Sequence, residues 1–323
     1  MKTIKYVELV NIGSYFTKIF AKNFISFIEY MKCWVCGSNK NKFLGGKEFK
    51  KNLVPSDVAI TNDQYGKTLP LYECLNCSFI YAYPLPDNIL SLYENLEDEV
   101  YIDSLSPRFK EMKHLMKMAT NFHPNAKNIL DVGAGVGLMV KAAVEMKLDA
   151  TGVEPSKWLV NQAKKIFNIN LIEGIVPSKE LEGKKFDIVF AVDVIEHLSE
   201  PVEFLNTLKN YLNDDGIIFI ATPDSNSFLA KKLGRKWWHY RLAHIGYFNH
   251  KSMKEAVSKA NLKIEKFDRQ NWYLPLGYLS VRLSNYLPVN FFVNFLKKFP
   301  KVENTTIRLN LHDNLVVILR KNN

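Results

Sequence analysis

The fold of this chain is decided by residues 129–137, which read Ile-Leu-Asp131-Val-Gly133-Ala-Gly135-Val-Gly137. A short apolar run enters a turn that holds three glycines, and the helical stretch 138–147 follows it. Glycine lets the backbone turn sharply and lets a ligand approach where a Cβ would otherwise stand. The spacing G-x-G-x-G differs from the G-x-G-x-x-G of dinucleotide-binding folds. The turn therefore predicts a ligand loop without identifying the ligand.

An acidic residue follows this turn at the distance that a nucleoside-binding crossover requires. Glu154 ends the next apolar strand, 21 residues after Gly133. A carboxylate in that position accepts hydrogen bonds from both hydroxyls of a ribose. Each hydrogen bond to a charged group is worth about 1.5–3 kcal/mol, so we expect Glu154 to carry most of the affinity for a nucleoside. The alternative is an exposed glutamate at a strand end.

Strands and helices alternate from Lys127 onward. The expected strands are 128–132, 150–154, 169–173, 186–192, 216–222, 263–271 and 314–320, and the expected helices are 138–147, 158–167, 201–212 and 252–260. The run 186–192 lacks the alternation of a half-exposed strand, as expected where both faces of a sheet are covered. The pattern predicts an α/β fold with a doubly wound, mostly parallel, seven-stranded Rossmann-like sheet.

All four cysteines fall into two C-x-x-C pairs. The pairs are Cys33 with Cys36 and Cys74 with Cys77, and 37 residues separate them. Two such turns bring four thiolates to one tetrahedral Zn²⁺, with each sulfur at about 2.3 Å. All four ligands are then protein atoms, so we predict structural zinc in a zinc-ribbon-like module. A lost or replaced metal and thiol chemistry remain as alternatives, although a redox motif is expected as one C-x-x-C beside a βαβ unit.

Three blocks, taken with the cysteine pairs, resemble a known family. They are Asp131–Gly137, Gly152-Val-Glu154-Pro-Ser156 and Phe186-Asp-Ile-Val-Phe-Ala-Val-Asp193-Val-Ile-Glu196-His197-Leu198. Their order and spacing resemble class I S-adenosylmethionine-dependent methyltransferases over about residues 127–270. The preceding module carries Tyr72-Glu-Cys74, Cys77-Ser-Phe79 and Pro84-Leu-Pro86. It is similar to the zinc-bearing subgroup found in sugar and polysaccharide modification.

The resemblance implies S-adenosylmethionine as cofactor and assigns residues to it by position. The implied cofactor-binding residues are Asp131, Gly133, Gly135, Gly137, Glu154 and Asp193. The glycines would border the methionine part, Glu154 would hold the ribose, and Asp193 would line the cleft after the fourth strand. The family's usual acid after the third strand is absent, since Ile175-Val-Pro177 follows Gly174. Contacts to adenine are therefore expected from the backbone.

The candidate catalytic residues are His197, His244 and Tyr240. A sulfonium carries an activated methyl group, so the protein must align an acceptor and take a proton where one has to leave. His197 follows the fourth strand, at the edge of the sheet where ligands bind, and a purely structural role for it stays open. His244 and Tyr240 lie in 237–248, whose position resembles the acceptor side of the family. A packed aromatic loop is the alternative there.

The block after the fourth strand also limits which acceptor atom is expected. Asp193-Val-Ile-Glu196 stands where enzymes that methylate amino groups of nucleic acids usually carry Asn/Asp-Pro-Pro-Tyr/Phe, so an oxygen or carbon acceptor is expected. We predict a methyltransferase acting on a sugar, a glycan or a lipid-linked small molecule. An RNA methyltransferase that docks through the zinc module is an alternative, but residues 31–86 hold seven Lys and no Arg. A non-catalytic cofactor-binding protein and a dinucleotide oxidoreductase are further alternatives.

Composition agrees with a globular enzyme. Apolar residues make up 47% and charged residues 24% of the 323 residues, which excludes a disordered or fibrous chain. The net charge is +10, but 36 of the 43 basic residues are Lys and they are spread along the chain. A solvated lysine surface is expected, with anionic partners as the alternative. No apolar stretch reaches the roughly 18 residues of a membrane span, and no signal peptide is recognised, so the cytoplasm is the expected location.

We predict four parts and one insertion. Residues 1–30 form an amphipathic helix, 31–86 the four-cysteine module, 87–123 connecting helices, and 124–323 the methyltransferase domain with an insertion at about 274–303. Asp87 is expected to cap the first connecting helix and Ser199 the helix 201–212. The insertion is rich in Phe and Leu and carries Lys297-Lys298. Core packing competes with an acceptor lid, an oligomer interface and a patch that holds the chain at the inner face of the membrane.

Overall fold

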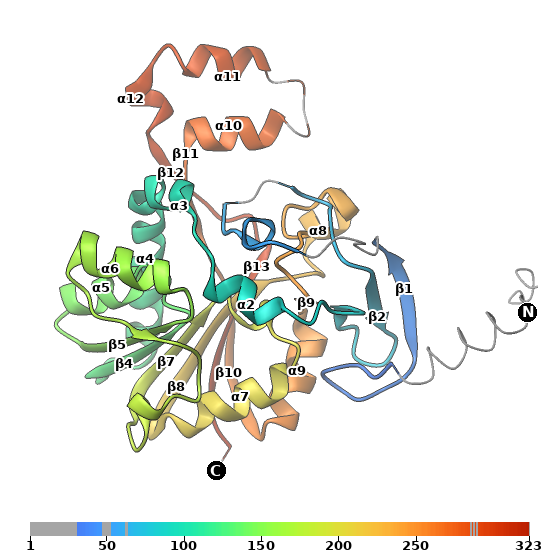
Figure 1. Cartoon of the computed structure of the whole chain (residues 1–323), viewed down its shortest axis with the longest axis vertical. Coiled ribbons are helices and arrows are strands. Elements are labelled where there is room, and N and C mark those ends of the chain that lie inside the picture. Colours follow the sequence, from blue (N-terminus) through green and yellow to red (C-terminus); the bar gives the residue numbers. More distant parts are fainter. Residues whose placement is uncertain are drawn as a thin grey trace, which may run out of the picture.

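The computed structural model describes residues 31–46, 53–61, 64–284, 286, 288 and 290–322. The amphipathic helix predicted for residues 1–30 lies outside the described residues. A seven-stranded sheet forms the centre of the fold (Figure 1). In spatial order its strands are β10 (Leu262–Arg269), β13 (Asn314–Lys321), β8 (Leu212–Pro223), β7 (Phe186–Val192), β4 (Asn128–Val132), β5 (Asp149–Glu154) and β6 (Ile172–Glu173).

The strand directions confirm the predicted doubly wound sheet. The strands β4 to β8 run parallel. The last strand, β13, lies antiparallel between β8 and β10. The residues from Leu315 to Leu319 are each at most 2% exposed. Because the strand is covered on both faces, it has no position for a solvated side chain, which explains its unbroken apolar run.

Helices cover both faces of the sheet because neighbouring residues of a strand point to opposite sides. Ile129 of β4 packs in a buried cluster with α4 (Leu105–Phe122) and α5 (Leu138–Glu145). The next residue, Leu130, packs on the other face with α7 (Pro201–Asn210) and α9 (His250–Lys259). Figure 1 shows α6 (Lys157–Phe167) on the same side as α5.

Short elements complete the chain. They are α2 (Ile89–Glu94), α3 (Glu99–Asp103), α8 (Phe228–Leu233) and the 3-10 turns η1 (Pro55–Val58), η2 (Lys179–Leu181), η3 (Ile195–His197) and η4 (Gly234–Lys236). Both predicted caps are wrong. The N-cap of α2 is Asn88 rather than Asp87, and the N-cap of α7 is Glu200 rather than Ser199, and neither side chain makes a capping hydrogen bond. Pro201 opens α7 without one because its missing N–H leaves one donor fewer to satisfy.

The cysteine module is built on a small antiparallel sheet that the rest of the chain completes. Its strands are β1 (Asn41–Gly45), β2 (Leu71–Cys74), β3 (Ile80–Ala82) and β9 (Gly246–Tyr247). The last of these comes from far along the sequence. Beside it, the N–H of Ala82 donates to the carbonyl of Ile245 at 2.8 Å, and the N–H of Ile245 donates to the carbonyl of Glu196 at 2.9 Å. Ile245 thus connects the cysteine module to Glu196, which follows strand β7 of the central sheet.

The predicted insertion forms a helical hairpin on a two-stranded stalk. β11 (Trp272–Pro275) pairs antiparallel with β12 (Thr306–Leu309), and between them lie α10 (Leu276–Ser284), α11 (Asn290–Leu296) and α12 (Pro300–Glu303). Figure 1 shows this hairpin standing clear of the central sheet, at the top of the view. Phe291 is 84% exposed, and Phe295 and Phe299 are each 48% exposed. Core packing against the sheet, one of the alternatives for the insertion, does not account for these exposed side chains.

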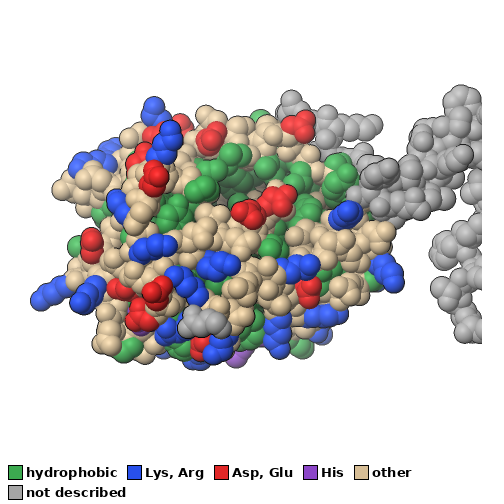
Figure 2. Space-filling view, turned by 90° about the horizontal axis from the view of Figure 1, so that it is seen from below, with side chains coloured by type: hydrophobic (Ala, Val, Ile, Leu, Met, Phe, Trp, Pro, Cys, Tyr) green, Lys and Arg blue, Asp and Glu red, His purple; other side chains and the backbone are tan. Residues whose placement is uncertain are grey.

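The surface agrees with the dispersed lysines of the sequence. On the face seen in Figure 2, basic side chains are interspersed with acidic ones and do not gather into one patch. Among the described residues, no helix has both the length and the apolar character needed to cross a bilayer.

Candidate functional site

A cavity of about 510 Å³ opens at the carboxyl ends of β4, β5 and β7. This is a switch point of the sheet, because β4 lies between β5 and β7 and the connections on its two sides run to opposite faces. In open parallel sheets ligands bind in the crevice at this point. The volume lies within the range of about 300–1,000 Å³ that is typical of small-molecule sites.

The glycine turn forms one wall of the cavity with bare backbone. Gly133 and Gly135 have φ angles of +76° and +56°, which favour glycine. A Cβ on Gly133 would stand 2.6 Å from Cγ2 of Val194, and a Cβ on Gly135 would stand 3.0 Å from the hydroxyl of Tyr101. Gly137 is the left-handed N-cap of α5 and does not line the cavity. Two of the three predicted glycines therefore face the ligand space, and the third turns the chain into the helix.

Glu154 reaches from the end of β5 to the glycine turn. Its Oε2 accepts a hydrogen bond from the N–H of Gly135 at 2.8 Å, and its Oε1 accepts one from the N–H of Ser156 at 2.9 Å. Burial raises the pKa of Glu154 to about 7, and these two donors act in the opposite direction. Each oxygen keeps a second lone pair. Because Glu154 also lines the cavity, it can accept hydrogen bonds from a ligand.

The neighbouring acids Asp131 and Asp193 also line the cavity. Burial, followed by the charge of Glu154, raises the pKa of Asp131 to about 7. Asp193 follows β7 with a φ of 53°, and burial raises the pKa of its carboxyl as well. Glu111 lines the cavity too, which makes four carboxyl groups in one crevice. Ionising them without a counter-charge costs free energy, so the cavity suits a ligand that brings positive charge or hydrogen-bond donors.

These residues fit S-adenosylmethionine on the chemistry that they offer. The bare glycine backbone leaves room for the chain of the ligand, Glu154 offers acceptors for ribose hydroxyls, and buried carboxylates suit a sulfonium cation. Beyond β6, Gly174, Ile175 and Val176 line the cavity without an acid. That wall offers apolar contact and backbone groups to a base, as the missing third-strand acid led us to expect.

Two residues of this end were missed from the sequence. Arg108 of α4 lines the cavity, its guanidinium lies 4.9 Å from the ring centroid of Tyr101, and its Nε donates to the Ser104 hydroxyl at 3.0 Å. Tyr101 follows the N-cap of α3, Asp98, which accepts a hydrogen bond from its backbone N–H at 3.0 Å. Both precede the glycine turn in a segment with no motif of its own.

His197 stands at the acceptor side of the cavity. Its Nδ1 lies 2.7 Å from the carbonyl of Ala243 and 2.8 Å from the hydroxyl of Tyr93, which itself donates to the same carbonyl at 2.9 Å. A carbonyl only accepts, so Nδ1 carries the proton and Nε2 is left as a base. Burial lowers the pKa of His197 to about 4, so the imidazole is neutral at physiological pH.

Two further imidazoles continue this wall. His244 stands edge-on to His197 with 4.9 Å between ring centroids, and His239 stacks on His244 at 5.7 Å. Burial lowers the pKa of His244 well below its ordinary value, and its buried Nδ1 has no hydrogen-bond partner among the described residues. His239 was not predicted. Its Nε2 lies 3.5 Å from Oδ2 of Asp313, which comes from the loop before the last strand.

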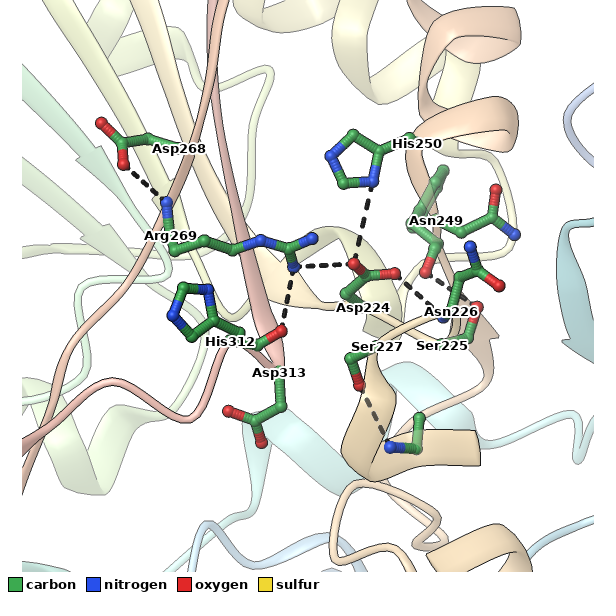
Figure 3. A network of polar contacts seen from close by, with 12 residues as sticks. Asp224, Ser225, Asn226, Ser227, Asn249, His250, Asp268, Arg269, His312 and Asp313 are labelled. Carbon is green, nitrogen blue, oxygen red and sulfur yellow. Dashed lines mark hydrogen bonds and ion pairs between the residues drawn. The ribbon is translucent and has the colours of Figure 1, made fainter. Parts of the chain in front are cut away.

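A polar network holds Asp313 in place (Figure 3). The N–H of Asp224, directly after β8, donates to the carbonyl of Asp313 at 2.8 Å. Arg269 of β10 donates to Oδ2 of Asp224 at 2.7 Å and to the carbonyl of His312 at 3.1 Å. Trp272 donates to Oδ1 of Asp313 at 2.8 Å. The network leaves Oδ2 of Asp313 directed at His239.

The aromatic segment 237–248 is divided between core and cavity. Tyr240 does not line the cavity. Its ring packs against Trp237 and Tyr247 at 5.5 Å and 4.9 Å between centroids, so the structure places this predicted catalytic residue away from the other candidates. Trp238, His239, Arg241, Ala243 and His244 do line the cavity. Sequence position alone could not separate the two sets, because the turns between 234 and 245 follow no helical or strand period.

The four cysteines meet as predicted. Their sulfurs all lie within 4.8 Å of one another, with 3.5 Å between Cys33 and Cys77 and 3.4 Å between Cys36 and Cys74. All four are free thiols. Ligands at about 2.3 Å from a tetrahedral zinc are about 3.8 Å apart, so the cluster fits Zn²⁺. Each C-x-x-C turn closes with a residue of positive φ, Gly37 at 75° and Ser78 at 61°, whose N–H bonds back to the first cysteine.

Comparison with known proteins identifies the central domain. A family model described as a methyltransferase domain matches residues 105–266, slightly more than half of the 323-residue chain. The match begins at the helix α4 and ends within β10, so it contains the glycine turn, Glu154, Asp193 and His197.

Two curated relatives are named as ubiquinone biosynthesis O-methyltransferases. The ubiquinone biosynthesis O-methyltransferase of Pelagibacter ubique is 28% identical over 184 residues, which cover 53% of this chain and 76% of that protein. The protein of the same name from Rickettsia prowazekii is 26% identical over 204 residues, which cover 58% of this chain and 79% of that protein. Among solved structures, a SAM-dependent methyltransferase of Thermotoga maritima is 17% identical with a TM-score of 0.47, covering 72% of this chain and 99% of that chain.

Proposed function

The chain belongs to the methyltransferase family whose model it matches and is a class I SAM-dependent methyltransferase, and from that premise we propose that it methylates a hydroxyl oxygen on a ring-bearing, largely apolar acceptor. The observation that carries this proposal is the joint lining of one cavity by the cofactor-side acids and by His197. The relatives named for ubiquinone biosynthesis support the oxygen acceptor. They favour a ubiquinone-type ring over the sugar or glycan expected from the sequence.

At the cofactor side, the chain's own residues bind and orient. Glu154 accepts hydrogen bonds from the ribose hydroxyls, and the backbone of Gly133 and Gly135 admits the methionine part. Arg108, which lines this end of the cavity beside Tyr101, would meet its carboxylate. When bound, S-adenosylmethionine supplies a methyl group on a sulfonium that is already a good leaving group. Asp131 and Asp193 favour that positive charge by lying in the same crevice.

At the acceptor side, His197 takes the proton. The bound cofactor would supply the methyl group to the acceptor oxygen, and that oxygen would give up its proton. The hydroxyl proton passes to Nε2 of His197, whose Nδ1–H is held by the Ala243 carbonyl. The resulting imidazolium lies close to the buried Glu196 carboxyl. Apolar side chains such as Ile60 and Leu90 supply the rest of this wall.

Replacing His197 with Asn is expected to lower kcat by a factor of about 100 or more, because general-base catalysis contributes about 10²–10⁴. Binding of S-adenosylhomocysteine should stay unchanged. The measurement is transfer of labelled methyl from S-adenosylmethionine to dihydroxybenzoates, with nucleotide sugars as the competing acceptor class. His244→Asn should lower kcat by less than tenfold. His312→Asn should leave kcat unchanged, because His312 lies in an exposed loop and its φ of 54° can also be adopted by Asn. Label in sugars alone would contradict the acceptor, and a His197→Asn variant as fast as wild type would contradict the base.

We also propose that the four cysteines hold one structural Zn²⁺. The support is the sulfur cluster itself, with spacings close to the edge of a zinc tetrahedron. All four positions around the ion would be filled by protein, so the metal would take no part in methyl transfer.

The exposed hairpin suggests where the acceptor comes from. We propose that α11 and α12 sit on an anionic membrane surface. Phe291, Phe295 and Phe299 would enter the interface, and the exposed lysines Lys297, Lys298 and Lys301 would lie over acidic headgroups. The support is this charge complementarity and the placement of α10, which carries Arg282 into the cavity wall.

Replacing Phe291, Phe295 and Phe299 together with Ser should reduce flotation with vesicles that contain phosphatidylglycerol by more than tenfold. Each buried Phe is worth about 1.5–3 kcal/mol. Phe228→Ser is the matched control, because Phe228 is 75% exposed but lies in α8. Equal flotation of the triple variant and wild type would contradict the membrane contact, as would loss of a dimer in sedimentation without any change in flotation.

A further inference from the structure

The cavity is lined by arginines rather than by lysines, as far as the structure describes the chain. Arg108, Arg241 and Arg282 line it, which is three of the seven arginines in the sequence. No lysine among the described residues lines it, although the sequence holds 36 lysines. Arginine differs from lysine in its planar fork, which bonds a carboxylate or phosphate with two parallel donors. A lysine-rich protein that places arginine at one site therefore points to recognition of an anion there.

Arg241 and Arg282 mark the acceptor end. Arg241 lies among the histidines of the segment 237–248. Arg282 comes from α10 of the hairpin, and its guanidinium lies 4.8 Å, 5.5 Å and 5.9 Å from the ring centroids of Tyr278, Tyr65 and Trp238. Three aromatic rings thus surround the guanidinium, and the side chain of Tyr65 also forms a hydrogen bond with it. Arg108, in contrast, belongs to the cofactor side beside Tyr101.

Neither acceptor-side arginine has an anionic partner in the protein. The ion pairs among the described residues include neither of them. Arg241 donates from its two Nη atoms to the carbonyls of Ile60 and Ala59, so part of its role is to hold that loop. The Nε atom of each arginine is buried and has no hydrogen-bond partner in the described part of the chain.

Arg241 and Arg282 bring positive charge to the cavity, and none of the ion pairs among the described residues neutralises it. Burial lowers the pKa of Arg241, and the Arg282 cation acts in the same direction. The pKa of Arg282 is itself raised, because Tyr278 and Tyr65 outweigh the effect of burial. A half-buried pair of cations without counter-ions destabilises the free protein, and a bound anion removes that cost. Each orphan Nε–H is a donor that such an anion can satisfy.

We propose that Arg241 and Arg282 bind an anionic group, a carboxylate or a phosphate, carried by the acceptor. The inference rests on the proposed function and narrows it: the acceptor is an anionic ring compound. Its ring lies against Trp238 and the histidines, its hydroxyl faces His197, and its anionic group faces the two arginines. The hairpin then has a part in specificity, because α10 supplies one of the two cations.

The test is calorimetry on the full chain saturated with S-adenosylhomocysteine. The probes are 3,4-dihydroxybenzoate against its neutral match 3,4-dihydroxybenzyl alcohol, and phenyl phosphate against phenol. We expect one anion to bind at least about tenfold more tightly than its neutral match, the scale of one charge-assisted bidentate contact. The arm that shows the preference tells a carboxylate from a phosphate.

Variants tie the preference to the arginines. Arg282→Met should abolish it, Arg282→Lys should keep a reduced preference, and Arg308→Met, at an exposed arginine of β12, should leave it unchanged. Arg241→Gln is the second variant, and its retained binding of S-adenosylhomocysteine reports that it is folded. Equal binding of each anion and its neutral match, or a preference that survives in both Arg282→Met and Arg241→Gln, overturns the inference. Failure of methyl transfer with the anion preference intact would instead count against the proposed reaction.

Discussion

Replacing Glu154 with Ala is expected to weaken binding of S-adenosylhomocysteine by a factor of about 100 or more. Two backbone donors position this carboxylate, at 2.8 Å and 2.9 Å, and lone pairs are left for two ribose hydroxyls. Two hydrogen bonds to a charged group are worth about 3 kcal/mol even at the low end of their range, and about 1.4 kcal/mol corresponds to a factor of ten. Isothermal calorimetry measures the change directly.

The chain offers a matched control for this variant. Glu173 ends the neighbouring strand β6 opposite Glu154 in the sheet register, but it is exposed and does not line the cavity. Glu173→Ala should bind the cofactor product as wild type does. If both variants bind equally well, Glu154 is not the ribose ligand.

The pKa of the Glu154 carboxylate predicts how the affinity for S-adenosylhomocysteine varies with pH. The pKa of Glu154 in the free protein is raised to about 7 by burial, and only the ionised form accepts from both hydroxyls. Binding should therefore strengthen by about tenfold between pH 6 and pH 8. Glu154→Gln should bind weakly and show a smaller pH dependence than wild type.

The second large effect is expected at the cysteines. We expect one zinc per chain in protein purified without chelators. Cys74→Ser, at a fully buried ligand, should lower the melting temperature by about 10 °C or more, because a structural zinc contributes several kcal/mol of folding free energy. Methyl transfer should fall as well, since β9 and Ile245 join the module to the segment that holds His197.

Ser78→Gly is the control for that variant. Ser78 has a φ of 61° at the position that Gly37 occupies in the first C-x-x-C turn. Glycine at this position therefore removes backbone strain without replacing a cysteine. This variant should keep its zinc and melt no lower than wild type. Absence of zinc by elemental analysis, or an unchanged melting temperature for Cys74→Ser, would contradict a structural metal.

The parts of the site that the sequence could predict are those that lie in local patterns. The glycine turn and Glu154 belong to one strand–helix–strand unit, so a spacing of 21 residues is enough to bring them together. The four cysteines are recognised in the same way, from two tight turns. The central sheet was predicted because its strands are apolar on both faces and the helices between them keep a clear period.

The rest depends on contacts between distant residues that have no local pattern. Tyr93 meets His197 across 104 positions, and His239 meets Asp313 across 74. Neither contact leaves a repeat or a motif to read. Tyr240 shows the converse: it has the right residue type in the right segment, but the turn directs its ring into the core. The strand β9 is two residues long, too short for any periodicity.

Because that short strand closes the cysteine sheet, the chain cannot be divided at residue 86 into a portable cofactor unit and a removable appendage. A fragment that begins at Asp87 would leave Trp237, Tyr247 and Phe248, all fully buried in the intact molecule, facing water. Recombination that exchanged the first 86 residues between relatives would have to exchange 237–248 along with them. Acceptor preference should therefore be transferred between relatives only when residues 1–86 and 237–248 are exchanged together.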